Sequence, residues 1–296
     1  MDNDQDFTSE DEWSGRAYPY VPYGILEKDP QSLWYRTVNE YSRLRLSKEQ
    51  DKMAALSGLA KQMQSLRPPE DRYLVGLWEK TLLSDLLWTQ GWSYTAPNSR
   101  ISRYPSWSWA SSPYQVEWSR DFNISLKCTQ VEATKVTTRG PSHMANCIEA
   151  TITLKAPLLD ATPLLTAAQA HIAASRESGD YESSSPFGHL YPDPYDAFIT
   201  NLDHLYVHYY SSDSGSYIPH ITPAETSGCF ILLATSNRSL LDLSAIHVQK
   251  EQSSDCYKRV SLASVKHPTA KNKYPKNAST VRWLIEDPPT RSITLI

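Results

Sequence analysis

The sequence predicts an α+β fold in which an N-terminal helical segment packs on a mainly antiparallel β domain. Apolar residues recur at helical spacing through residues 31–90, and after Gly91 the apolar residues alternate as they do in strands. We therefore expect an acidic disordered tail and connector at 1–30, a helical segment at 31–90 and an antiparallel β-rich domain at 91–296.

The tail is predicted from charge. Six carboxylate side chains and no basic one occur in the first twelve residues. Like charges repel along such a run, which favours disorder, and a tail that binds a basic partner is the alternative. Residues 13–30 are rich in Tyr, Pro and Gly, which favours an extended connector.

Two helices are indicated before residue 68. The apolar stripe of the first is Leu33, Trp34, Val38 and Tyr41. Residues 47–50 have the form of a capping box, after which helical spacing resumes at Met53, Leu56, Leu59, Ala60 and Met63. Pro68 and Pro69 end this helix because proline cannot donate to the helical ladder. We interpret Gly58 inside it as a place of close helix packing.

A third helix is expected after Asp71, whose carboxylate can cap its first turn. Its buried stripe would be Leu74, Leu77, Trp78, Leu82 and Leu86. About three helices, each of about 12–18 residues, therefore fill the helical segment.

After Gly91 the pattern is that of strands. Trp107 and Trp109 alternate with small residues, as in a strand with one apolar face. In residues 147–156 one face is formed by Ile148, Ala150, Ile152 and Leu154, which indicates a half-buried antiparallel strand. Further strands are expected at 116–118, 124–136, 205–210, 229–234, 245–249, 257–262 and 293–296. A polar loop near 175–196 is expected to be mobile.

Composition limits the class of function. The net charge of −4 and the isoelectric point near 6.1 argue against a nucleic-acid binder. The longest apolar run is about six residues, too short for a transmembrane helix, so we expect no membrane partner. The four cysteines form no C-x-x-C pair and no signal peptide is seen, which favours reduced thiols and a cytoplasmic location, with disulfides as the alternative.

A search for catalytic motifs gives no site. The sequence contains no phosphate-binding glycine loop and no G-x-S-x-G motif. His204 and His208 would align as metal ligands on a helix, but their surroundings are β-rich, and strand residues four apart lie about 13 Å from each other. A lysine-rich stretch near the C-terminus contains Lys266, Lys271, Lys273 and Lys276. We interpret it as a solvated loop, with a phosphate-binding site as the alternative. We assign no catalytic residue, no metal ligand and no cofactor, and the binding residues stay unknown.

Six of the nine tryptophans fall within residues 71–118, which we name the tryptophan segment. They are Trp78, Trp88, Trp92, Trp107, Trp109 and Trp118. Each large aromatic side chain buries about 150–250 Å². The segment is therefore the centre of a core or an exposed binding surface. The small residues that alternate with Trp107 and Trp109 favour the core.

Seven sequence blocks, in order, carry a family resemblance. They are 34–42 (WYRTVNEYS), 51–60 (DKMAALSGLA), 73–78 (YLVGLW), 85–88 (DLLW), 104–110 (YPSWSWA), 256–260 (CYKRV) and 291–296 (RSITLI). Together they resemble the C-terminal region of fungal heterokaryon-incompatibility (HET) domain proteins. The motifs of the HET domain itself, which lies N-terminal to these blocks in the family, do not appear in residues 1–33.

The resemblance implies a non-catalytic scaffold or regulatory region with a role in fungal self/non-self recognition and regulated cell death. Its partner would be another protein or the missing HET domain. One alternative function is that of a TIR-like hydrolase that cleaves NAD, or of another enzyme whose site is not readable from the sequence. The second alternative is that the chain is a truncated or decayed fragment. The oligomeric state stays open.

Overall fold

The computed structural model describes the chain in twelve stretches. They are residues 29–44, 51–90, 103–113, 115–118, 122–125, 129–140, 147–161, 196–202, 205–210, 228–236, 242–266 and 290–296. Four sequence-based predictions lie outside them: the acidic tail and connector up to residue 28, the capping box at 47–50, the polar loop up to residue 195 and the lysines after Lys266.

The first two predicted helices are confirmed. Helix α2 spans Pro30–Ser42 and begins at Asp29, whose carboxylate accepts the backbone N–H groups of Gln31 and Ser32. Helix α3 spans Lys52–Ser65 and ends before the predicted proline stop. Most residues of the predicted apolar stripes are buried, with Trp34 and Val38 on α2 and Met53, Leu56, Ala60 and Met63 on α3. Leu33 and Tyr41 are partly buried, and the prediction is wrong for Leu59, which is 48% exposed.

The prediction of a long third helix is wrong. The chain instead forms a tight hairpin of β1 (Tyr73–Leu74) and β2 (Leu77–Trp78), a 3₁₀ turn at Glu79–Thr81 and a four-residue helix α4 (Leu82–Asp85). Val75 and Gly76 have φ angles of 47° and 100°, which reverse the chain and exclude a helix there. Asp71 caps no helix, and its carboxylate pairs with Arg67 at 2.8 Å.

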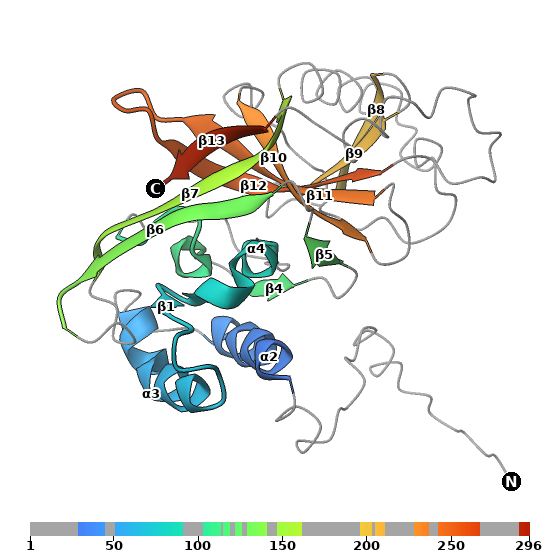
Figure 1. Ribbon diagram of the computed structural model, residues 1–296. Helices are drawn as coiled ribbons and strands as arrows, with labels where there is room; N and C mark the ends of the chain where they lie inside the picture. Colours follow the sequence, from blue (N-terminus) through green and yellow to red (C-terminus); the bar gives the residue numbers. More distant parts are fainter. Residues whose placement is uncertain are drawn as a thin grey trace, which may run out of the picture.

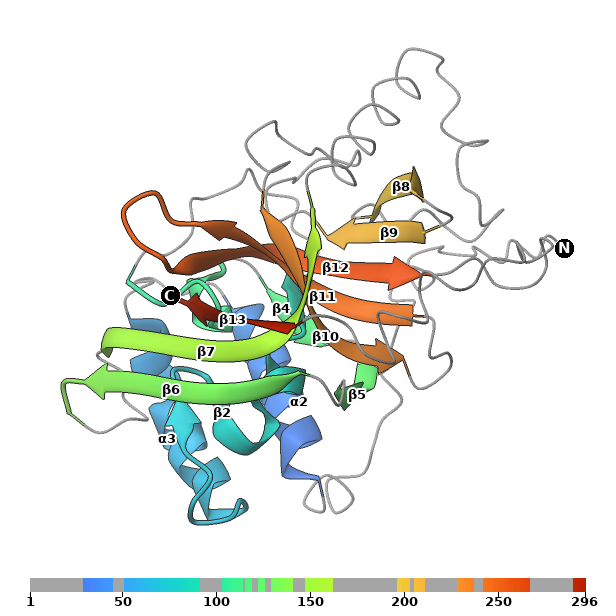
Figure 2. The ribbon, with the colours of Figure 1, turned by 45° about the horizontal axis from the view of Figure 1, so that its top comes forward.

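Nine strands form one large sheet (Figures 1 and 2). They are β5 (Phe122–Ser125), β6 (Gln130–Thr138), β7 (Cys147–Asp160), β8 (Asp196–Leu202), β9 (Leu205–Tyr210), β10 (Cys229–Ser236), β11 (Asp242–Lys250), β12 (Tyr257–Lys266) and β13 (Thr290–Leu295). Five of these close into a ring in the order β7–β10–β11–β12–β13. Only the β12–β13 pair among the described pairings is parallel, so the predicted antiparallel character is confirmed.

The later strand predictions, from 205–210 to 293–296, each coincide with a strand of the sheet, but other predictions differ from it. The stretch predicted at 124–136 contains two strands, β5 and β6, which pair with β10 and β7 respectively, and β8 was not predicted. On β7, Ala150, Ile152 and Leu154 are buried as expected, whereas Ile148 near the strand's start is 62% exposed. Trp107 and Trp109 do not lie in a strand, because a hydrogen bond from the Ser108 amide to the Pro105 carbonyl turns the chain, and a 3₁₀ turn follows at Trp109–Ser111. Trp88–Gln90 (β3) and Val116–Trp118 (β4) form a separate two-stranded sheet.

Helices and sheet share one hydrophobic cluster, which runs from Trp34 on α2 to Leu295 on β13. In Figure 1 the tryptophan segment, with β1, α4 and β4, lies between the two long helices and the sheet. The α+β arrangement with helices at the N-terminal side is therefore present. Within the described stretches, no helix has both the length and the apolar character needed to cross a bilayer.

Candidate functional site

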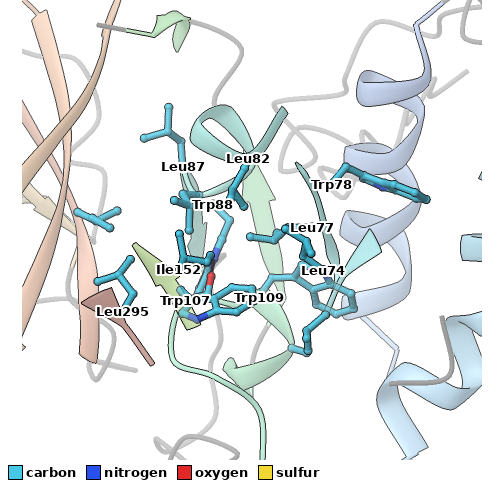
Figure 3. Close-up of a cluster of buried hydrophobic side chains, with 14 of the residues drawn as sticks. Leu74, Leu77, Trp78, Leu82, Leu87, Trp88, Trp107, Trp109, Ile152 and Leu295 are labelled. Carbon is cyan, nitrogen blue, oxygen red and sulfur yellow. Dashed lines mark hydrogen bonds between the residues drawn. The ribbon is translucent and has the colours of Figure 1, made fainter. Parts of the chain in front are cut away.

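The tryptophan segment forms the centre of the core. The five most buried indoles, with at most 2% of their surface exposed, are Trp34, Trp78, Trp88, Trp107 and Trp109. Figure 3 shows Trp78 on the side of α2 and Trp107 near Ile152 of the sheet. The interpretation of these side chains as core is confirmed, and Trp92 lies outside the described residues.

The hairpin turn at Gly76 holds two distant tryptophans. The indole N–H groups of Trp34 and Trp109 both donate to the Gly76 carbonyl, each at 2.9 Å. The Ser108 hydroxyl donates to the neighbouring Val75 carbonyl at 2.6 Å. One turn therefore accepts hydrogen bonds from α2 and from the far end of the tryptophan segment, because a backbone carbonyl has two lone pairs.

Two buried cations lie over tryptophan rings on the helical side. The Lys52 ammonium is 5.3 Å from the Trp109 ring centroid and donates to the Ser112 carbonyl at 2.5 Å. The Arg67 guanidinium is 4.6 Å from the Trp78 ring centroid. Buried charges require such partners, since desolvation of an unpaired ion is costly.

A third buried cation comes from the sheet. Arg259 of β12 is 2% exposed, and its guanidinium stacks 3.7 Å from the Trp88 ring centroid. The same guanidinium donates to the backbone carbonyls of Leu86, at 3.0 Å, and of Trp88. Arg259 thereby joins the sheet to the tryptophan segment through both terminal nitrogens of its guanidinium group.

Ser106 binds two strands where the ring closes. Its backbone N–H donates to the backbone oxygen of Ile296 at 3.0 Å, and its hydroxyl donates to the same oxygen. The Arg259 amide donates to the Ser106 hydroxyl at 2.9 Å. Since the parallel β12–β13 pairing has one paired position, at Tyr257 and Leu295, Ser106 supplies further hydrogen bonds between these strands.

Asp85 is a fully buried carboxylate that gathers donors from several elements. One oxygen accepts from the Tyr35 hydroxyl at 2.8 Å and the Gln31 amide at 3.3 Å, and the other accepts from the Trp78 amide at 2.8 Å. Burial raises the pKa of Asp85 to about 6, while the hydrogen bonds from the Trp78 amide and the Tyr35 hydroxyl and the Arg67 charge act in the opposite direction.

Tyr35 completes the contact between α2 and Asp85. Its ring stacks on Trp118 with 4.4 Å between centroids and 5° between planes. The Trp118 indole donates to the Asp85 backbone carbonyl at 2.9 Å. Burial and the Asp85 charge raise the Tyr35 pKa above its ordinary value, so the phenol stays protonated and donates at neutral pH.

The residues singled out by sequence analysis do not form a site in the described part of the chain. His208 lies on strand β9, whereas His204 is outside the described residues. Among the residues that the structure places, no group of three or more His, Cys, Asp or Glu side chains gathers in a way that could hold a metal. Cys147, Cys229 and Cys256 are free thiols, and Cys128 is outside the described residues.

Sequence reasoning missed the polar residues of the tryptophan cluster. Asp85 and Arg259 each lie in one of the sequence blocks that carry the family resemblance, but no local pattern marks either residue as buried. Gly76 carried a readable signal, because a glycine inside a predicted helix weakens that prediction. Comparison of the chain with protein-family models, with curated proteins and with solved structures finds no match.

Proposed function

We propose that this chain is a non-catalytic scaffold or regulatory region of a HET-type protein. Its role would be in fungal self/non-self recognition and regulated cell death, in the cytoplasm. Its binding partner would be another protein, such as a HET domain, and neither a nucleic acid nor a membrane. The sequence blocks that resemble the C-terminal region of HET proteins support this family context.

One observation carries the non-catalytic role. The buried ionised side chains of the tryptophan cluster each connect elements of the fold. Lys52 connects α3 to Ser112, Arg259 connects β12 to Leu86 and Trp88, and Asp85 accepts from α2 and β2. Groups held in this way fix the position of one element against another, which is what a scaffold requires.

The sequence blocks that carry the family resemblance also support a non-catalytic role. The blocks at 34–42, 73–78, 85–88 and 104–110 supply Trp34, the Gly76 turn, Asp85 and Ser106. In this chain those residues make the hydrogen bonds that join the helices to the tryptophan segment and that segment to the sheet. A framework of this kind, built from the blocks that carry the resemblance, is what we expect of a module that presents a surface.

A second candidate, an enzyme that cleaves NAD, is favoured by one observation. Asp85 has a raised pKa beside the Tyr35 hydroxyl, and perturbed carboxylates of this kind recur in active sites. Against it, the Asp85 side chain has no exposed surface, so no substrate contacts it in this conformation.

Nicotinamide release decides between the two. The full chain is incubated with NAD, and the free nicotinamide is measured over time, with Asp85→Asn as the variant. We expect no turnover with either protein. Turnover by the wild type that disappears in Asp85→Asn would replace the scaffold proposal with an enzyme. A matched Glu149→Gln variant, whose carboxylate is half exposed on β7, controls for loss of charge elsewhere.

The third interpretation, a fragment that does not fold alone, has a separate test. A shared hydrophobic cluster from α2 to β13 predicts one cooperative thermal transition of the full chain. Near-UV circular dichroism reports it through the buried tryptophans. A broad, non-cooperative change with temperature would favour the fragment.

A further inference from the structure

Tyr35 contacts a base at its hydroxyl and an indole on the face of its ring. The hydroxyl donates to Asp85 Oδ1 at 2.8 Å, and the ring stacks on Trp118 with 4.4 Å between the centroids. Loss of an electron turns a phenol into a much stronger acid, so a base that is already hydrogen-bonded to it takes the proton in the same step. The geometry around Tyr35 therefore suits a combined transfer of one electron and one proton.

Two other tyrosines of the core show what is particular to Tyr35. The Tyr41 hydroxyl donates to the backbone carbonyl of Lys52 at 2.7 Å, and an amide carbonyl is a very weak base. The Tyr73 hydroxyl is buried without a hydrogen-bond partner. Of these three phenols, only that of Tyr35 faces a carboxylate that can accept its proton.

Cations decide where a positive charge can lie among the buried indoles. Three indoles have a cationic side chain over the ring: Trp78 with Arg67, Trp88 with Arg259 and Trp109 with Lys52. Removing an electron from such a ring would place two positive charges in contact, and their repulsion is strong in a buried environment. Trp118 lies beside Asp85, whose carboxyl is ionised at neutral pH because its pKa is about 6. Electrostatics therefore favour Trp118 over these three indoles as the site of a transient positive charge.

Hydrogen bonds determine which group keeps its proton. The Trp118 indole N–H donates to the Asp85 backbone carbonyl at 2.9 Å, and this carbonyl is too weak a base to take the proton. An oxidised Trp118 therefore stays a cation and keeps its power to oxidise the stacked phenol. The Asp85 carboxyl is fully buried, and burial favours its neutral form, so the carboxyl retains a proton that it receives.

We propose that Trp118, Tyr35 and Asp85 form a proton-coupled redox site that accepts one oxidising equivalent from a one-electron oxidant. The oxidant, an inorganic radical, takes one electron from the Trp118 indole and is reduced to its anion. One electron then passes from Tyr35 to Trp118, while the Tyr35 hydroxyl proton passes to Asp85 Oδ1. The products are a neutral indole, a neutral tyrosyl radical and a protonated carboxyl. This activity goes beyond the scaffold role.

Pulse radiolysis of the full chain in azide solution tests the proposal. The azidyl radical oxidises tryptophan, and the visible absorption bands of the two radicals follow the transfer from tryptophan to tyrosine. We expect Tyr35→Phe to remove the growth of the tyrosyl band and Asp85→Asn to slow it on the order of a hundredfold. The matched control is Tyr41→Phe, which also removes a phenol hydrogen bond of α2 but no carboxylate contact, and which leaves the growth unchanged.

A solvent isotope comparison on the wild type adds a test that needs no variant. Because the proton moves together with the electron, the tyrosyl band should grow more slowly in heavy water than in ordinary water, whereas a merely structural hydrogen bond predicts equal rates. Near-UV circular dichroism verifies that each variant keeps the wild-type core. If Asp85→Asn does not fold, Tyr35→Phe and the isotope comparison decide the matter.

Several results would overturn the proposal. Undiminished growth of the tyrosyl band in Tyr35→Phe would place the tyrosyl radical on another residue. Equal rates in heavy and ordinary water, or an unchanged rate in a folded Asp85→Asn variant, would show that the carboxylate takes no proton. A loss in Tyr41→Phe as large as the loss in Tyr35→Phe would show that the effect is not specific to the phenol that faces Asp85.

Discussion

Replacing Gly76 by alanine tests whether the β1–β2 turn organises the tryptophan cluster. A Cβ atom there would lie 2.5 Å from Trp109 Nε1, and the residue has a φ of +100°. The left-handed backbone costs an alanine about 1–2 kcal/mol. If the indole moves away, its hydrogen bond to the Gly76 carbonyl is lost, and an unpaired buried donor costs about 1–3 kcal/mol. We therefore expect a loss of about 2–5 kcal/mol in the free energy of unfolding.

Two other glycines separate the contributions. Gly140 also has a positive φ, of +93°, but no atom lies within 4 Å of a Cβ built on it, so Gly140→Ala should cost only the backbone term of about 1–2 kcal/mol. Gly58 has neither feature, which shows that the prediction of close packing at this residue was wrong. Gly58→Ala should therefore stabilise the protein by about 0.5–1 kcal/mol through helix propensity.

Urea unfolding followed by tryptophan fluorescence measures all three variants, with linear extrapolation to water. The expected order of stability is Gly58→Ala, wild type, Gly140→Ala and Gly76→Ala. If Gly76→Ala is no less stable than Gly140→Ala, then Trp109 does not pack against the turn, and the reasoning fails. An unchanged m value shows that the comparison concerns the same transition.

Three further changes test the rest of the cluster by the same unfolding assay. Trp107→Ala should cost about 3–5 kcal/mol, and unchanged stability would contradict its place in the core. Arg259→Met should cost about 3 kcal/mol because the carbonyls of Leu86 and Trp88 lose a charged donor, and a variant as stable as wild type would show that the guanidinium does not bind them. The pKa of Asp85 is about 6 in the folded state and 3.8 for an aspartate without these surroundings, as in the unfolded chain. Between these values the native state binds more protons than the unfolded state, so the free energy of unfolding falls by about 3 kcal/mol as the pH rises through this window. In Asp85→Asn this decline should be absent, and a constant stability difference between variant and wild type from pH 3 to 7 (about one unit beyond each pKa) would refute the assignment.

Periodicity predicted the elements that have one buried face. The stripes of α2 and α3 and the alternation on β7 each separate buried from exposed residues, so spacing alone reveals them. It failed between Tyr73 and Trp88, where every residue of the hairpin β1–β2 is buried. A segment that is apolar on all sides matches the helical and the strand patterns equally, and only Gly76 argued against a helix.

The polar part of the cluster could not be predicted for a different reason. Lys, Arg and Asp are rarely buried, and nothing in the local sequence marks Lys52, Arg67 and Asp85 as the exceptions that they are. What keeps them inside is a set of partners distant in sequence, such as Tyr35 and Asp85, 50 residues apart. Local spacing contains no information about such pairs, whereas the fully buried tryptophans were recognisable as core by their size and number.

Strand β12 shows why helices and sheet form one unit. The Arg259 side chain binds the carbonyls of Leu86 and Trp88, and the backbone amide of the same residue binds the Ser106 hydroxyl. Ser106 in turn binds the backbone oxygen of Ile296, next to β13. The closure of the ring between β12 and β13 thus depends on the tryptophan segment, which is itself held by α2 through Trp34 and Gly76. Buried hydrogen bonds therefore form a continuous connection from α2, through the Gly76 turn and Ser106, to the junction of β12 and β13, because each link joins residues that lie far apart in the sequence.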